Sequence, residues 1–205
     1  MHHFAIEQNM RKVIQSPNIC AYPVFDAVQT NIAIRYFSKR PIEDTHILRI
    51  LNAARLCQSG KNLQPWYFIL IRDRTALDKL AGYMKGDIDE DELKNATIAI
   101  AVISDPTSEF HVVDAGRAIQ NMTLVAWELG IGSVMISGLE PPNRESCRAQ
   151  IKRFLDVPQN LNLVDLVIFG YRKRQIPVKR KNRKKIADIA FLEKFGGPLT
   201  LTGSQ

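Results

Sequence analysis

Apolar residues recur at helical spacing in two long stretches of the chain. From Thr45 to Cys57, and again from Ala115 to Leu129, they return every three or four residues and form one stripe along a helix. Asp44 and Thr45 offer an N-cap to the first stretch, and Gly130 follows the second, where helices commonly end in a left-handed residue. The pattern predicts two amphipathic helices, and the longer one should lie in the core.

Uninterrupted apolar runs alternate with the helical stretches. Each run has the length of a strand and is rich in β-branched or aromatic residues, which is typical of buried strands. The predicted strands are Trp66–Ile71, which we expect to be covered on both faces, Thr97–Ile103, Ile131–Ile136 and Leu161–Phe169.

Shorter elements complete the pattern. We predict helices at Asp73–Tyr83 and Arg144–Leu155 and a short amphipathic close at Ile186–Phe195, and we expect the acidic stretch Asp87–Glu92 to be exposed. Alternating helices and strands predict an α+β domain with α/β/α layers. We expect one domain over residues 1–205, with peripheral arms at 1–21 and 196–205.

Length and composition narrow the class of protein. The 205 residues, 45% of them apolar, suffice for one substantial core, and no apolar run is long enough to cross a membrane. The first 25 residues mix charged and apolar side chains, unlike a signal peptide, so we expect a soluble, cytoplasmic protein without a membrane partner. Cys20, Cys57 and Cys147 lie far apart, so neither a disulfide framework nor a metal site is expected.

The net charge of +7 is concentrated near the C-terminus. Cations cluster at Arg172–Arg174 and Lys179–Lys185, and such clusters suit an acidic partner, a nucleic acid or a phosphorylated ligand. A nucleic-acid-binding protein is the less favoured alternative, because aromatic residues do not interleave with the cations and no binding module is recognisable. No dinucleotide fingerprint or P-loop pattern occurs either.

A polar loop, Ser59–Gln64, separates the first helix from the first strand. Its hydroxyl, side-chain amides and glycine would suit a polar heterocycle that needs directional hydrogen bonds. A capped connection, whose amides satisfy the backbone, explains the same residues and is favoured when the loop is considered alone.

Taken together with two other segments, this loop resembles the nitroreductase family. The three motifs are Arg35-Tyr36-Phe37-Ser38-x-x-Pro41-Ile42, Ser59-x-x-Asn62-x-Gln64-Pro65-Trp66 and Asp114-x-Gly116-x-x-x-Gln120-Asn121. The resemblance runs from about Ala27 to about Ile189. It implies a nitroreductase-like fold, with a mixed central sheet flanked by helices, and an intertwined homodimer that holds FMN at its interface.

The resemblance also implies a set of cofactor-binding residues. Arg35 would lie beside flavin N1 and O2, where reduction builds negative charge. Lys181 and Arg183 would bind the phosphate, which matters because Asn31 and Ala33 replace the arginine and serine usual in the family. The remaining predicted contacts are Ser59, Gly60, Asn62 and Gln64 around a flavin held mainly by the other subunit, and Ser137 and Gly138, whose backbone N–H groups would face flavin N5 and O4.

The implied reaction needs no catalytic side chain. NADH or NADPH would reduce FMN, and a nitroaromatic, quinone or similar small acceptor would then receive the electrons by a ping-pong mechanism. Reductive dehalogenation and flavin handling are the alternatives within the same fold. Tyr83–Asn95 and Leu139–Arg144 are candidate lids, whereas His111 and the polar residues of the third motif, such as Asp114 and Gln120, are expected to be structural.

Overall fold

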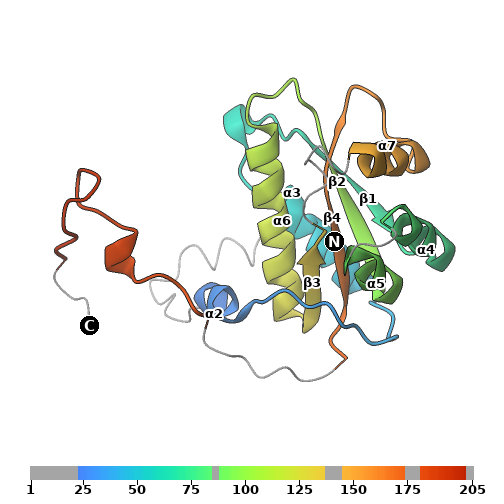
Figure 1. Cartoon of the computed structure of the whole chain (residues 1–205), viewed down its shortest axis with the longest axis horizontal. Coiled ribbons are helices and arrows are strands. Elements are labelled where there is room, and N and C mark those ends of the chain that lie inside the picture. Colours follow the sequence, from blue (N-terminus) through green and yellow to red (C-terminus); the bar gives the residue numbers. More distant parts are fainter. Residues whose placement is uncertain (1–22, 85–87, 137–144, 174–180, 202–205) are drawn as a thin grey trace, which may run out of the picture.

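The computed structural model describes residues 23–84, 88–136, 145–173 and 181–201 of the chain (Figure 1). A four-stranded sheet lies at its centre, with the strands in the order β1-β2-β4-β3. The strands are β1 (Trp66–Ile71), β2 (Ile98–Ser104), β3 (Ile131–Met135) and β4 (Asn162–Tyr171). The four predicted strands are therefore confirmed in type and order, and the bounds of β1 match the prediction at both ends.

Every ladder between these strands is antiparallel. The parallel pairing among the described residues is an isolated bridge between Ala33 and Ser133. The expected mixed sheet is therefore antiparallel apart from this bridge. Strand β1 is also an edge strand, and Tyr67 is 53% exposed. Both faces of β1 nevertheless pack against a core: Ile69 and Ile71 lie in one, and Phe68 and Leu70 lie against the other. The expectation that β1 would be covered on both faces is therefore confirmed, apart from Tyr67.

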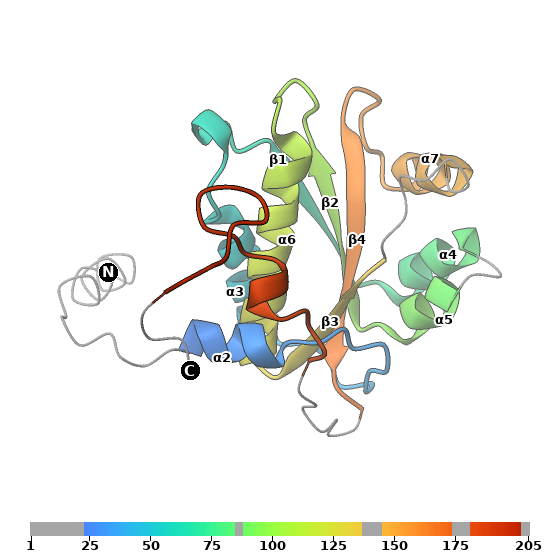
Figure 2. The same cartoon turned by 60° about the vertical axis from the view of Figure 1, so that its left-hand side comes forward.

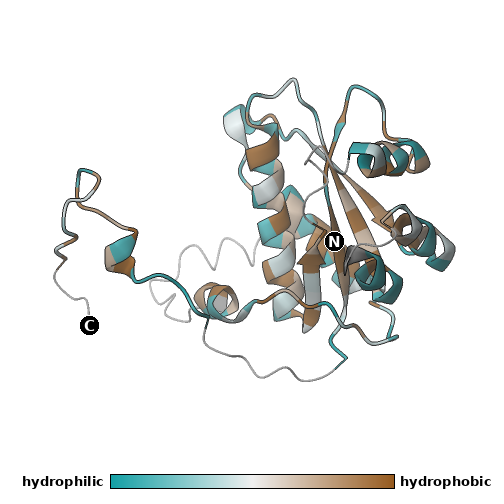
Figure 3. Cartoon of the chain, in the orientation of Figure 1, coloured by the Kyte–Doolittle hydropathy of each residue, from teal (hydrophilic) through white to brown (hydrophobic). Residues whose placement is uncertain are grey.

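Helices cover both faces of the sheet (Figure 1). Helices α3 (Asp44–Arg55) and α6 (His111–Glu128) pack on one face, while α4 (Arg74–Tyr83), α5 (Ile88–Asn95) and α7 (Glu145–Phe154) lie on the other. Strand β2 shows why: Ile98, Ile100 and Val102 point into one core, and the intervening residues point into the second. The hydropathy colouring shows this apolar centre (Figure 3). The α/β/α layering is confirmed.

The ends of the two long helices follow local chemistry. Helix α6 ends before Gly130, which has φ of 75° and donates its N–H to the carbonyl of Trp127 at 3.0 Å. Helix α3 begins one residue before the predicted Thr45. Its N-cap residue is Glu43, which makes no capping hydrogen bond because its carboxylate binds Arg40 and Tyr171 instead.

Two further predictions need correction. The stretch expected to be exposed at Asp87–Glu92 lies largely in α5, and both Glu92 and Leu93 are buried. The C-terminal close contains only a short 3₁₀ helix, η3 (Ile186–Asp188), and Phe195 is 95% exposed. Helix α2 (Pro23–Thr30) was not predicted. Figure 1 shows that the segment containing η3 leaves the body beyond α2, and in Figure 2 the same segment comes forward of the body.

Among the helices of the described ranges, none combines the length and the apolarity that crossing a bilayer would require.

Candidate functional site

A cavity of about 660 Å³ opens between α2, the C-terminal half of α6 and strand β3. Its lining mixes aliphatic groups with amides, hydroxyls and two cations, a combination that suits a large ligand with a flat apolar part and an anionic part. The lining residues are Val28, Asn31, Ile32, Ala33, Arg35, Gln120, Thr123, Leu124, Ser133, Val134, Met135 and Lys181.

Residues 31–38, here called the crossing segment, carry Arg35 to this cavity. The segment runs past β3, where Ile34 donates its N–H to Ser133 O at 2.9 Å, and on past the end of β4. Gly132 and Gly170 permit the close approach. A Cβ atom on Gly132 would lie 2.6 Å from Cβ of Ile34, and one on Gly170 would lie 2.7 Å from Cβ of Phe37. These two glycines therefore set the position of Arg35.

Lys181 reaches the cavity from the C-terminal segment. Its Nζ donates to Val28 O, at the end of α2, at 2.7 Å. Burial lowers the pKa of Lys181 below its ordinary value, and the positive charge of Arg183 lowers it further. An ammonium group that has lost part of its hydration next to another cation gains more from a bound anion than a fully solvated one does. Lys181 is therefore well placed to bind a phosphate.

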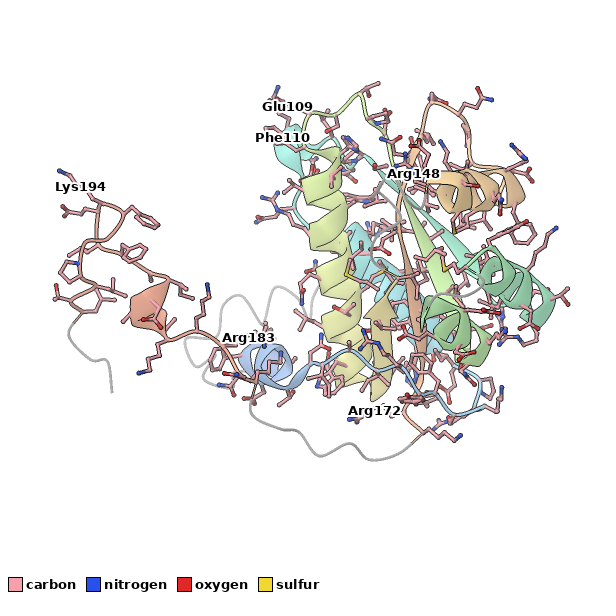
Figure 4. All side chains as sticks on the ribbon, in the orientation of Figure 1. Glu109, Phe110, Arg148, Arg172, Arg183 and Lys194 are labelled. Atoms are coloured by element: carbon pink, nitrogen blue, oxygen red, sulfur yellow. The ribbon has the colours of Figure 1, made fainter. Side chains whose placement is uncertain are left out.

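The polar loop Ser59–Gln64 lies elsewhere in the same chain. It contains η1 (Gly60–Asn62) and sits beside Phe110 at the N-terminal end of α6, as Figure 4 shows. The cavity instead uses Gln120, Thr123 and Leu124, farther along that helix. Within one chain, the loop and the cavity therefore form separate groups.

Hydrogen bonds within the loop give it an unusual backbone. Ser59 Oγ accepts the N–H of Gln64 at 3.0 Å, while Lys61, Asn62 and Gln64 have φ values of 52°, 56° and 49°. Left-handed residues other than glycine are uncommon and cost energy. Ser59 thus satisfies the backbone, as the capped-connection alternative expects, whereas the side chains of Asn62 and Gln64 remain exposed.

Asp114 on α6 holds this loop in place. Its side chain is fully buried, and Oδ2 accepts the N–H of Gly60 at 3.0 Å while Oδ1 accepts from Arg117 Nη1 at 3.0 Å. The ring of Phe110 covers Gly60, because a Cβ atom added there would lie 2.5 Å from Cδ2 of Phe110. The structural role expected for Asp114 is therefore a specific one, which is to anchor the polar loop.

The predicted cofactor-binding residues within the described ranges fall into three sets. Arg35 and Lys181 line the cavity together, and Ser59, Gly60, Asn62 and Gln64 gather at the other end of α6. Arg183 is exposed, donates to Asn182 O at 2.9 Å and is not among the residues that line the cavity. Figure 4 shows Arg183 next to α2. Ser137 and Gly138 lie outside the described residues, as does the candidate lid Leu139–Arg144.

Sequence reasoning missed most of the cavity wall. Gln120 was expected to be structural but lines the cavity, and Thr123, Leu124 and Ser133 were not singled out. The signal in the sequence was weak, since Gln120 and Thr123 flank the apolar stripe of α6 on one side. Asn121 and His111 do have structural roles: Asn121 Nδ2 donates to Ala53 O at 3.2 Å, and His111 Nδ1 lies 2.8 Å from Ser104 Oγ.

A family model described as the nitroreductase family matches residues 32–102 and 87–171, which together cover well over half of the chain. The chain belongs to the nitroreductase family. The matched residues include Arg35 and the polar loop but end before Lys181. The C-terminal wall of the cavity therefore lies outside the region that this nitroreductase model recognises.

Curated relatives in the nitroreductase family differ in their named activities. The "Putative NADH dehydrogenase/NAD(P)H nitroreductase" of Archaeoglobus fulgidus is 38% identical over 152 residues, which cover 71% of this chain and 83% of the relative. The iodotyrosine deiodinase of Thermotoga neapolitana is 24% identical over 172 residues, which cover 72% and 88%.

Solved nitroreductase structures share the fold. An FMN-dependent nitroreductase from Clostridium difficile superposes with a TM-score of 0.74 at 27% identity and covers 83% of this chain and 99% of its own. A Desulfovibrio desulfuricans structure, named a "putative nitroreductase in complex with FMN", superposes with a TM-score of 0.71 at 25% identity and covers 84% and 98%. The nitroreductase fold predicted from the motifs is thereby confirmed.

Proposed function

We propose that this protein is an FMN-dependent oxidoreductase that takes electrons from NADH or NADPH and passes them to a small acceptor. The observation that carries the proposal is the cavity in which Arg35 and Lys181 face a largely aliphatic wall. Two solved relatives are named for FMN, which supports the same cofactor here.

The cavity residues fit FMN in size and chemistry. Its volume of about 660 Å³ lies within the usual range for cofactor sites. Leu124, Val134 and Met135 offer apolar surface to a flat ring, and Lys181 offers a partly desolvated cation to a phosphate. Asn31 takes the place of the arginine that is usual in the family, so we assign the main phosphate contact to Lys181 and expect Arg183 to add to it.

We further propose that the active form is a homodimer in which each site draws on both chains. The polar loop and the cavity form separate groups along α6 within one chain, which supports a site that a second chain completes. A second copy placed along α6 could supply its own loop to the cavity. The exposed apolar side chains of Val113 on α6 and Val24 on α2 support an interface on this side.

The chemistry supplied by bound FMN is the acceptance of a hydride from reduced nicotinamide and its later delivery to the acceptor. The protein's own residues bind and orient. Arg35 holds a positive charge where negative charge develops, and Lys181 fixes the phosphate end. The partner's loop would offer the amides of Asn62 and Gln64 to the ring edge. In this arrangement a nicotinamide donor and an acceptor would enter the cavity in turn.

Reductive dehalogenation is the second candidate activity, and it is supported by the deiodinase relative. The two activities are distinguished by assaying the reduced enzyme against a nitroaromatic and a halogenated phenol. Consumption of the first without halide release from the second supports the nitroreductase reaction. Halide release alone would favour the alternative.

A complementation experiment tests the shared site. K181A and N62A should each weaken FMN binding about tenfold or more, because each removes a polar contact with the cofactor. K184A is the matched control, since Lys184 belongs to the same basic run and is exposed. We expect K184A to bind FMN as the wild type does.

Mixed dimers of K181A and N62A chains, purified with two different tags, provide the decisive sample. If each site uses Lys181 of one chain and Asn62 of the other, one site in the mixed dimer is intact and binds FMN with wild-type affinity. If each site is built within one chain, every site carries one substitution and no tight site appears. That second result would contradict the shared site.

A further inference from the structure

Glu92 on α5 contacts Arg35 from the side of the protein core. Its Oε1 lies 2.5 Å from Nε of Arg35, and its side chain is only 5% exposed while that of Arg35 is 50% exposed. Arg35 also lines the cavity. The Nε edge of this guanidinium therefore meets a buried carboxylate, and Arg35 also borders the proposed FMN site.

Helix α5 presents Glu92 from a fixed position. Leu93 is fully buried in the core beneath the helix. Arg74 on α4 donates from Nη2 to Leu93 O at 3.3 Å and from Nη1 to Ala96 O at 3.0 Å, which ties the last turn of α5 to α4. A buried carboxylate on an anchored helix can hold a flexible arginine in place, because its charge attracts the guanidinium and is little screened by water.

We infer that Glu92 is a positioning residue for FMN redox chemistry: it orients the Arg35 guanidinium toward the cavity and offsets part of its positive charge. This inference rests on the proposed function. Binding the carboxylate through Nε leaves the two terminal nitrogens of Arg35 for a ligand in the cavity. The planar group is then held ready before the ligand arrives, and less side-chain entropy is lost on binding.

The charge of Glu92 has a second consequence. Reduced FMN carries more negative charge than oxidised FMN, so a nearby cation favours the reduced form and a nearby anion disfavours it. Glu92 is almost completely buried, and its effect is therefore screened less than that of a surface carboxylate. With Glu92 in place, the reduction potential of bound FMN should lie below the value that Arg35 alone would give.

The test substitutes Glu92→Gln, which keeps the size of the side chain and one carbonyl oxygen but removes the charge. The matched control is Asp91→Asn, which removes the same charge from the neighbouring, exposed position of α5. The holoenzymes are titrated spectroscopically against a reference dye. The reduction potentials of protein-bound FMN and of free FMN together give the ratio of the protein's affinities for reduced and oxidised FMN.

We expect E92Q to raise this ratio about three- to tenfold, which corresponds to a potential about 15 to 30 mV higher for a two-electron couple, and D91N to leave it within about twofold of the wild type. A merely structural Glu92 would predict lower thermal stability or weaker FMN binding in E92Q with an unchanged ratio. That outcome would overturn the inference while leaving the proposed function intact.

Two further results are informative. If E92Q does not fold, E92D serves in its place: it keeps the charge but withdraws the carboxylate from Nε by one methylene, and the ratio should rise in the same direction by a smaller factor. An unchanged ratio in E92D would then overturn the inference. If the wild-type protein itself does not bind FMN, the proposed function fails, and this inference fails with it.

Discussion

Replacing Asp114 with alanine should loosen the polar loop without opening the cavity. The substitution removes the acceptor for the Gly60 N–H and the partner of Arg117, both at 3.0 Å, from a fully buried position. The loop also carries three residues with positive φ. Such a backbone persists only when surrounding contacts hold it, so the anchor matters more here than in an ordinary turn.

The contacts in the structure set the size of the effect. A hydrogen bond from a backbone N–H to a carboxylate is worth about 1.5–3 kcal/mol. The ion pair adds less than about 1 kcal/mol, because the side chain of Arg117 is 54% exposed and can be hydrated when the pair is lost. We therefore expect D114A to lower the free energy of unfolding by about 2–3 kcal/mol. D114N keeps an oxygen acceptor for Gly60 and should cost about 1 kcal/mol.

Urea unfolding at a single protein concentration measures this difference, with FMN affinity measured in parallel. Glu128→Gln is the control on the same helix: Glu128 is 58% exposed and lies 3.8 Å from Arg49. Removing the charge of Glu128 should change the free energy of unfolding by less than about 0.5 kcal/mol. If D114A matches E128Q in stability and still binds FMN as the wild type does, Asp114 does not anchor the loop.

Other substitutions test the supports of the site. G170A should lower the free energy of unfolding, measured by heat or urea, by about 1–3 kcal/mol, since its Cβ would lie 2.7 Å from Cβ of Phe37. G82A on α4 is the control, because a Cβ there meets nothing within 4 Å and should not destabilise the protein. Equal effects would contradict the close approach at β4. Hydrogen bonds from Tyr171 and then Arg40 lower the pKa of Glu43 from 4.5 to about 2. The stability that these hydrogen bonds contribute is fully present above the pKa that Glu43 has in the unfolded chain. It is lost as the pH falls through about 2, the pKa of Glu43 in the folded protein. Y171F should therefore lower the urea midpoint near neutral pH, and its difference from the wild type should shrink as the pH falls from about 4.5 toward about 2. A difference that stays constant with pH would show that the Glu43 contact contributes little.

Local pattern predicted the sheet well. The run Trp66–Ile71 has the length and side chains of a strand whatever surrounds it, and its bounds match β1 at both ends. Gly130 likewise marks the end of α6 because a left-handed residue is needed there. What the pattern could not show was position within the sheet, because edge and central strands can share an apolar composition.

Long-range contacts explain the parts of the site that the sequence did not reveal. Glu92 lies in an acidic stretch that is typical of a solvated surface, yet it is buried and forms an ion pair with Arg35, far away in the sequence. The bond between Gly60 and Asp114 likewise joins residues 54 positions apart. Arg35 and Lys181 were named through the family resemblance, while neighbours such as Gln120 became visible only when the elements were packed together.

The most direct test of the account is the absorption spectrum of the purified protein, followed under anaerobic conditions as NADH or NADPH is added. The account predicts visible flavin bands, either as purified or after reconstitution with FMN, that the nicotinamide bleaches and a nitroaromatic or quinone acceptor restores. A colourless protein that takes up no added FMN would contradict the central claim. So would bound FMN that neither nicotinamide can reduce.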